Sequence, residues 1–178
     1  MATGDRIDLD YNRTTGNVVY TVQGFRFPDP NNVPPEFVKN GKVITPFRHL
    51  LAMLSPTNPG QPIVITASQN DKNAFGDPVF SPDGSSVVVS LGTYGGEGDL
   101  QRTGLLSIPA REGGGAAPTG VHRGAAYDVS FSSDGKTLAY IDRDPKGNGT
   151  IHLMNADGTD DKTLTQSGNF GSPRFSPQ

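Results

Sequence analysis

A motif repeated along the chain limits the possible folds more than any other feature of this sequence. Each clear copy has a phenylalanine followed by Ser-Pro-Asp-Gly, by Ser-Ser-Asp-Gly or, in the last copy, by Ser-Pro. The phenylalanines are Phe80, Phe131 and Phe175, and a period of roughly 40 to 50 residues is typical of solenoids and propellers. We therefore expect one unit built by repetition, with an insertion in the longer step from Phe80 to Phe131. The copies begin at Asp77, Asp128 and Ser172.

The residues around each turn predict a β-hairpin. In the first clear copy, Pro82 supplies a preset φ and Gly84 a position with φ > 0, and a β-branched run follows at 87–89. A more diverged copy opens the chain, with a strand over 7–11, a turn over 12–16 and a second strand over 17–22. Each copy thus supplies two antiparallel strands.

Two further strands are expected in each copy. Residues 47–54 also fit helical spacing, because Phe47, Leu50, Leu51 and Leu54 fall at i, i+3, i+4 and i+7 after a proline. We favour a strand there, since the other copies require one at this place. The further strands are expected at 49–54 and 62–66, at 104–108 and 117–121, and at 150–154 and 162–165.

These strands predict an all-β fold of β-propeller blades, each of four antiparallel strands. The 23 glycines and 15 prolines agree with a chain that turns often. We expect residues 1–178 to form a single module of three blades plus one extra strand, a partial propeller or half of a six-bladed ring. The blades are expected at about 6–76 with an insertion at 24–48, at about 77–127 and at about 128–172, and a next blade starts at 173–178.

The last copy carries a family resemblance. Its segment 151–159 reads IHLMNADGT, ends in Leu164-Thr165 and is followed by SPRFSP at 172–177. This resembles the TolB-like (PD40, WD40-like) β-propeller repeat. The resemblance implies repeats of the kind found in the periplasmic propeller of the Tol system and in the non-catalytic propellers of prolyl-oligopeptidase-like peptidases. It implies a periplasmic or extracellular location, although residues 1–20 lack the pattern of a signal peptide, and it brings no catalytic residue.

Three blades pose a problem of closure. Blades bury their faces only against neighbouring blades, and propellers usually close with about 4 to 8 of them. The chain is therefore either a fragment of a longer propeller, or it joins a second copy in a six-bladed ring, the number common in TolB-like proteins. A rotation that fails to close gives a filament. In a ring, the extra strand at 173–176 competes with 7–11 for the same innermost position.

Composition and motifs exclude several functions. The net charge of −3 without a run of Lys or Arg argues against nucleic acid as a partner. No apolar stretch is long enough to insert in a membrane. The chain has no cysteine for thiolate chemistry and no Gly-x-Ser-x-Gly elbow. We expect no enzyme activity and no cofactor.

Long connections suggest where a partner binds. Those at 24–48, 92–103 and 142–149 all join the second strand of a blade to the third, so they lie on one face of the disc, and such insertions often mark a binding surface. The first is rich in proline and aromatic residues, which are costly to leave in water. The candidate partner-binding residues are Phe25, Phe27, Phe37, Tyr94 and Arg143.

Acidic and histidine residues give no metal prediction. Two groups have alternate oxygen ligands as in calcium loops but lack a distal glutamate, so we expect them to cap turns. The three histidines lie in different repeats, without metal-ligand spacing. The oxygen groups are Asp142, Asp144 and Asn148, and Asn155, Asp157 and Asp161.

The sequence thus predicts a non-catalytic protein-interaction or self-assembly module. Its partner is another protein or a second copy that completes the ring or extends a filament. Two alternatives remain open. One is the accessory propeller of a secreted or periplasmic hydrolase of the prolyl-oligopeptidase kind, and the other is a glycan-binding propeller.

Overall fold

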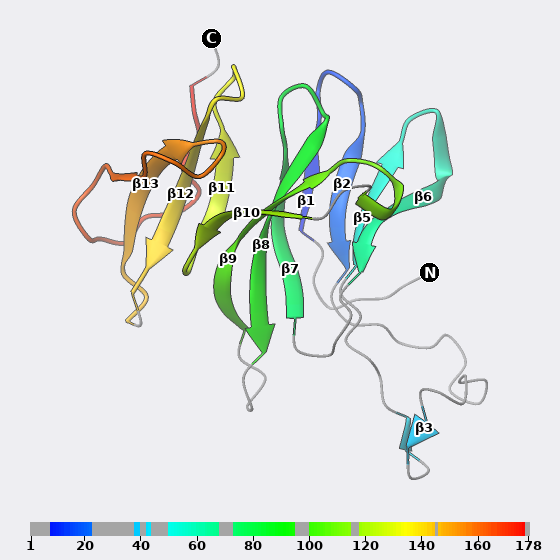
Figure 1. Ribbon diagram of the computed structural model, residues 1–178, viewed down its shortest axis with the longest axis horizontal. Helices are drawn as coiled ribbons and strands as arrows, with labels where there is room; N and C mark the ends of the chain where they lie inside the picture. The colour runs from blue at the N-terminus through cyan, green and yellow to red at the C-terminus, as the bar shows by residue number, and fades with distance from the viewer. Residues whose placement is uncertain are drawn as a thin grey trace.

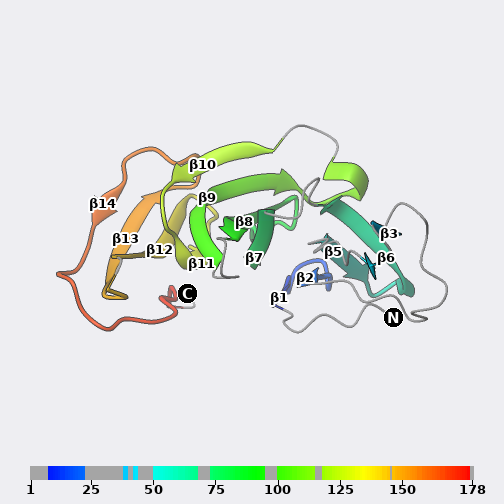
Figure 2. The ribbon, with the colours of Figure 1, turned by 90° about the horizontal axis from the view of Figure 1, so that it is seen from below.

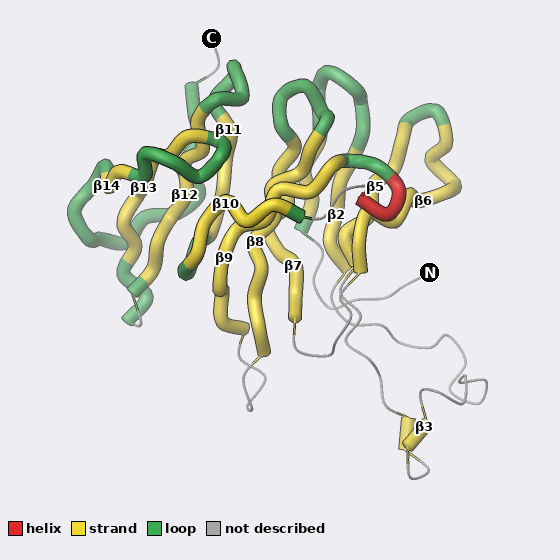
Figure 3. Tube along the Cα trace, in the orientation of Figure 1, coloured by secondary structure: helices red, strands yellow, loops and turns green. Residues whose placement is uncertain are grey.

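The computed structural model of the protein describes residues 8–22, 38–39, 42–43, 50–67, 73–94, 100–114, 118–144 and 146–176. Within these ranges the fold is all-β, as the repeat predicts, with three four-stranded antiparallel sheets. A short 3-10 helix, η2 (Glu112–Gly114), accompanies them, and Figure 3 shows it beside the strands. No helix in the described part of the chain is long and apolar enough to cross a membrane.

The first sheet has the strand order β1-β2-β5-β6. Residues 50–55 form strand β5, so the strand prediction is confirmed over the helical alternative there. A separate two-stranded sheet, β3–β4, lies in the predicted insertion. The strands are β1 (Leu9–Tyr11), β2 (Val18–Val22), β3 (Val38–Lys39), β4 (Lys42–Val43), β5 (Leu50–Ser55) and β6 (Asn58–Ala67).

The second sheet has the order β7-β8-β9-β10 and corrects one expectation. Within the predicted long connection at 92–103, residues 92–94 and 100–103 are strand, because pairing continues from Gly92↔Arg102 to Tyr94↔Leu100. The register of the β8–β9 ladder shifts between Leu91 and Gly92, and the pairing continues beyond this shift. The strands are β7 (Asn73–Phe80), β8 (Ser86–Tyr94), β9 (Leu100–Pro109) and β10 (Thr119–Arg123).

The third sheet has the order β11-β12-β13-β14. Its strands are β11 (Tyr127–Phe131), β12 (Thr137–Arg143), β13 (Gly149–Asn155) and β14 (Lys162–Thr163). The predicted extra strand, residues 173–176, is described but is paired to no strand of the described chain.

The repeated Asp-Gly turns close their hairpins by the same contacts. In the second sheet the hydroxyl of Ser81 donates to Asp83 at 2.6 Å, and Gly84 has a φ of 72°. In the third, Ser132 donates to Asp134 at 2.6 Å. These side chains satisfy the turn locally, which explains why the motif recurs.

The three sheets stand side by side as a fan. Figures 1 and 2 show β1, β7 and β11 on the inner side, with β6, β10 and β14 at the rim. Phe80 is buried in the core between the first two sheets, and Phe131 packs against the core between the last two, so they occupy matching places. The first core contains Val19, Leu51, Met53, Ile65, Phe75, Phe80, Val87, Val89 and Ile108, and the second contains Val88, Leu105, Val121, Ala126, Val129, Leu138, Tyr140 and Met154.

Candidate functional site

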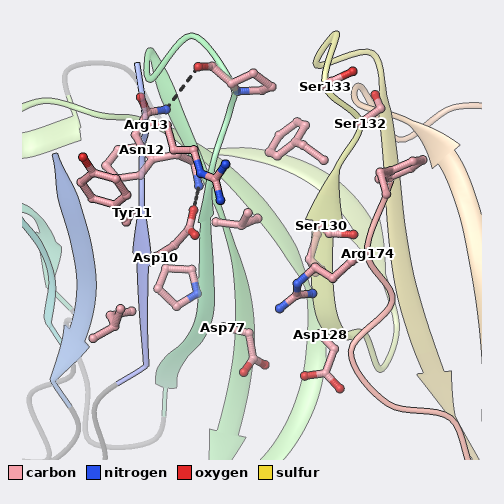
Figure 4. A pocket seen from close by; sticks show the side chains of 18 of the residues that line it. Asp10, Tyr11, Asn12, Arg13, Asp77, Asp128, Ser130, Ser132, Ser133 and Arg174 are labelled. Carbon is pink, nitrogen blue, oxygen red and sulfur yellow. Dashed lines mark hydrogen bonds between the residues drawn. The ribbon is translucent and has the colours of Figure 1, made fainter. Parts of the chain in front are cut away.

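The inner strands enclose a hollow of 740 Å³, here called the inner hollow. Figure 4 shows residues of β1, β7 and β11 along its wall together with Arg174 from the segment 172–176. Acidic side chains dominate the charge of this wall. The charged lining residues are Asp8, Asp10, Asp77, Asp128, Arg13 and Arg174.

Two of the lining residues, Asp77 and Asp128, are equivalent residues of successive repeats. Asp77, Asp128 and Ser172 stand at the same motif position and have φ values of 48°, 52° and 45°. This left-handed conformation is uncommon outside glycine, and Asp tolerates it better than most residues. At Asp77 and Asp128 it accompanies a register shift between the inner strand and its neighbour. The shift turns backbone groups of the inner strand away from their own sheet.

Carboxylates of one repeat accept hydrogen bonds from the backbone of the next repeat. Asp8 accepts from the N–H of Asp77 at 3.4 Å, and Asp10 accepts from the N–H of Phe80 at 2.9 Å. Asp128 accepts from the N–H of Ser172 at 3.2 Å. The acidic wall therefore joins neighbouring inner strands.

Asp77 makes a different set of contacts. It pairs with Arg102 at 3.1 Å and accepts from the hydroxyl of Ser90 at 3.1 Å. Burial raises the pKa of Asp77 above its ordinary value, and the Asp8 and Asp128 charges add to this, while Arg102 opposes it. The protonation of Asp77 therefore depends on the charges of Asp8 and Asp128 in the same wall.

Arg102 is a buried arginine that lies against the inner strand. Its guanidinium occupies the space where a Cβ on Gly76 would lie. Nη1 of Arg102 has no hydrogen-bond partner in the described part of the chain. Only glycine at position 76 leaves room for this arginine beside Asp77.

Arg143, a predicted partner-binding residue, lies between the third sheet and the segment that follows it. Its guanidinium donates to the carbonyls of Gly147 and Phe170, both at 3.1 Å, and lies 4.0 Å from Asp128. It also stands 5.6 Å from the ring centroid of Tyr127. These contacts give Arg143 a structural role, because they hold the segment after β14 against the third sheet. Arg143 and Tyr127 also line a hollow of 550 Å³.

The other predicted partner-binding residues are not brought to Arg143 by the described structure. Phe25, Phe27 and Phe37 lie outside the described residues. Tyr94 ends strand β8, and its side chain is likewise outside the description. The predicted partner-binding face therefore stays a prediction.

Two histidines from different repeats meet around one tyrosine, which sequence spacing did not reveal. The Tyr140 hydroxyl donates to Asp161 at 2.6 Å and lies 3.4 Å from His122 Nδ1 and 3.3 Å from His152 Nδ1. Burial, then the hydrogen bond to Asp161 and its charge, raise the pKa of Tyr140 well above its ordinary value. The group joins β10 of the second sheet to the third sheet.

Of the predicted turn caps, Asp144 and Asp157 act as caps, whereas Asp161 instead contacts Tyr140 and His152. Asp144 accepts from the backbone N–H groups of Lys146 and Asn148, and Asp157 accepts from that of Thr159. Hydrogen bonds from the Asn148 and Thr159 side chains, together with these backbone contacts, lower the pKa of the Asp144 and Asp157 carboxyls. Within the residues that the structure describes, no group of three His, Asp or Glu side chains is placed to hold a metal ion.

Comparisons with known proteins support the fold. No family model matches the sequence, and no curated protein matches it significantly. Solved structures do match. TolB from Acinetobacter baumannii is similar over 99% of this chain and 36% of its own, with a TM-score of 0.62 and 14% identity.

Two enzymes are also similar. An oligogalacturonate lyase in complex with manganese matches over 88% of this chain and 40% of its own, with a TM-score of 0.57 and 16% identity. A puromycin-hydrolyzing peptidase from Mycobacterium tuberculosis matches over 92% and 33%, with a TM-score of 0.50 and 16% identity. This chain spans less than half the length of these proteins. Together with its three sheets, these likenesses show that the chain has the fold of a partial β-propeller.

Proposed function

We propose that the chain is a non-catalytic interaction module of PD40-type blades, which associates with further blades from a second copy or from another polypeptide. By its resemblance to the TolB-like repeat, we place it in the periplasm or outside the cell. The chemistry of the described residues favours binding over catalysis. Three carboxylates of the inner hollow, those of Asp8, Asp10 and Asp128, accept hydrogen bonds from the backbone of the next repeat, and Asp77 is paired with Arg102.

One observation carries the proposal, namely the difference between inner and outer sheet faces. Each of the two junctions between neighbouring sheets contains a buried apolar core. The outermost first sheet instead leaves Leu9, Tyr11 and Val64 exposed. Large apolar side chains gathered on one face mark a site of protein association. In a propeller, the surface that fits such a face is another blade.

The experiment is the mass of the protein in solution, measured by light scattering over a range of concentrations, together with binding of a hydrophobic naphthalene-sulfonate dye. The proposal expects either an assembly of chains or a monomer that binds the dye on its open face. A monomer that binds no dye contradicts it, because no apolar face then awaits a partner.

A further inference from the structure

We propose that Asn148 is a deamidation site whose reaction is blocked while residues 164–176 lie against the third sheet. These residues, here called the return segment, follow β14 and run back from the rim toward β11, as Figure 2 shows. The proposal concerns a chemical modification of the chain itself, and it does not depend on the association proposed above.

The dipeptide Asn148-Gly149 has the chemistry that deamidation needs. In this reaction the backbone nitrogen of Gly149 bonds to Cγ of Asn148, and the bond from Cγ to the side-chain nitrogen breaks. The proton of the Gly149 N–H passes through solvent to the departing nitrogen, which leaves as ammonia, and a cyclic succinimide remains. Water then opens the ring to give aspartate or isoaspartate at position 148. Glycine favours the ring closure, because it has no side chain to hinder the attack and its backbone is permissive.

The fold requires glycine at position 149. A Cβ built on Gly149 would lie 2.7 Å from Cγ2 of Ile141, whose side chain is fully buried. Gly149 begins strand β13 and is paired with Arg143, whereas Asn148 just before it is exposed to solvent. A reactive dipeptide therefore stands where the third sheet has no room for a larger second residue.

The return segment holds the attacking nitrogen of this reaction. The N–H of Gly149 donates to the carbonyl of Gly168 at 2.8 Å, and the N–H of Gly168 donates to the carbonyl of Gly149 at 2.9 Å. The two glycines thus form a β-bridge between β13 and the return segment. A nitrogen bonded in this way keeps its proton and its orientation, so the bridge must open before the nitrogen can attack Asn148.

Asp144 restrains the group that is attacked. Nδ2 of Asn148 donates to Oδ2 of Asp144 at 3.0 Å, and the backbone N–H of Asn148 donates to Oδ1 at 2.9 Å. These contacts oppose the rotation of the Asn148 side chain that ring closure requires. Both reacting groups are therefore held by hydrogen bonds in the folded chain.

Deamidation converts the contact between Asn148 and Asp144 into a repulsion. The hydrogen bond from the Asn148 side chain is the largest cause of the lowered pKa of Asp144, so Asp144 is a carboxylate at neutral pH. The product has a second carboxylate where the Nδ2 donor was, and like charges at this spacing repel. Arg143 next to this turn donates to both Gly147 and Phe170. A disturbed turn therefore leaves the return segment bound less firmly after the reaction than before it.

The test measures the formation of aspartate and isoaspartate at position 148 by peptide mass spectrometry, while the full chain is incubated at mildly alkaline pH. The folded protein is compared with the same chain unfolded in urea. The folded protein should react at least about tenfold more slowly, because both hydrogen bonds of the bridge must open first.

Two variants connect this protection to the return segment, with circular dichroism to verify folding. Thr165→Val removes the hydroxyl that accepts from the N–H of Ile151 at 3.0 Å, which loosens the start of the return segment. The variant should react about two- to tenfold faster than the unaltered protein, since the reaction follows the population of the open segment. Thr103→Val is the matched control, because it removes a hydroxyl that donates to Leu91 in the second sheet, and its rate should be unchanged.

Equal rates for the folded and the unfolded chain overturn the proposal, as does a folded Thr165→Val that reacts no faster than Thr103→Val. A second measurement does not depend on these variants. Asn148→Asp reproduces the aspartate product and should speed hydrogen exchange of the Gly168 N–H. Asn155→Asp adds the same charge at the next turn of the sheet, where the side chain contacts Thr159, and should leave that exchange unchanged. Exchange at Gly168 that is equal in the two variants contradicts the loosening of the return segment.

Discussion

The carboxylate of Asp10 accepts a hydrogen bond of 2.9 Å from the backbone N–H of Phe80, which joins the innermost strands of the first two sheets. The repeat places serine or valine at the corresponding positions of the later copies, so this link is particular to the first junction. Its removal gives the first of four predictions.

Asp10→Ala should lower the free energy of unfolding by about 1 to 3 kcal/mol, because the Phe80 N–H loses a charged acceptor. Asp10→Asn keeps an oxygen acceptor and should lose less. Urea denaturation of the three proteins measures both changes. Equal losses in the two variants would show that the link to Phe80 is not the source of the stability.

Gly76→Ala should destabilise the protein by about 1 to 3 kcal/mol, because the new methyl group overlaps the buried guanidinium of Arg102. Gly120→Ala is the matched control on β10, since no heavy atom lies within 4 Å of a Cβ built there. Thermal unfolding of both variants is the measurement. If Gly120→Ala loses as much stability as Gly76→Ala, the close approach of Arg102 to Gly76 is not the cause.

The repeated turns predict a loss of stability in acid. Hydrogen bonds from the Ser81 and Ser132 hydroxyls hold the pKa of Asp83 and of Asp134 below their ordinary value. A carboxyl whose pKa is lowered by folding stabilises the protein above the unfolded pKa of about 3.9, and this contribution disappears as the pH falls through the lowered pKa. Urea midpoints measured at decreasing pH should therefore decline in this range.

The matched variant for the acid prediction carries Ser81→Ala and Ser132→Ala. It keeps both carboxylates but removes the largest cause of their shifts, so its acid decline should be shallower. An unchanged decline would assign the acid sensitivity to other groups.

Tyr140→Phe should cost about 1 to 3 kcal/mol, because the buried hydroxyl that donates to Asp161 at 2.6 Å is lost. Tyr11→Phe, at an exposed position, is the control and should be close to neutral. An ultraviolet titration gives a second readout, since Tyr140 should ionise at higher pH than an ordinary tyrosine. Ionisation of all tyrosines together in the ordinary range would contradict the buried environment.

Local patterns predicted much of the fold. The turns at Asp83 and Asp134 are determined by residues within five positions of each other, so their chemistry can be read along the chain. The strand at 50–55 could be preferred over a helix only because the other repeats require it. The prediction of a long connection from Gly92 onward was wrong for Gly92 to Tyr94, which continue the β8–β9 ladder, because a glycine such as Gly92 is compatible with a loop and with a strand alike.

The candidate site was harder to predict because it depends on contacts between repeats. Tyr140 and His122 belong to different sheets, and no spacing pairs them. The space for Arg102 depends on a glycine in another strand. The sequence did contain a signal for the unusual composition of the first sheet. Strands β5 and β6 contain no charged residue over their length, and attention to this absence would have marked the first sheet as unusual.

The left-handed residues Asp77 and Ser172 also affect how the protein unfolds. At Asp77 and at Ser172 the backbone donor is satisfied by a carboxylate of the preceding repeat. If one sheet unfolds, a backbone N–H of the next repeat therefore loses its hydrogen-bond acceptor. Such coupling between neighbouring sheets disfavours stepwise unfolding from one end, so we expect the three sheets to unfold together on heating.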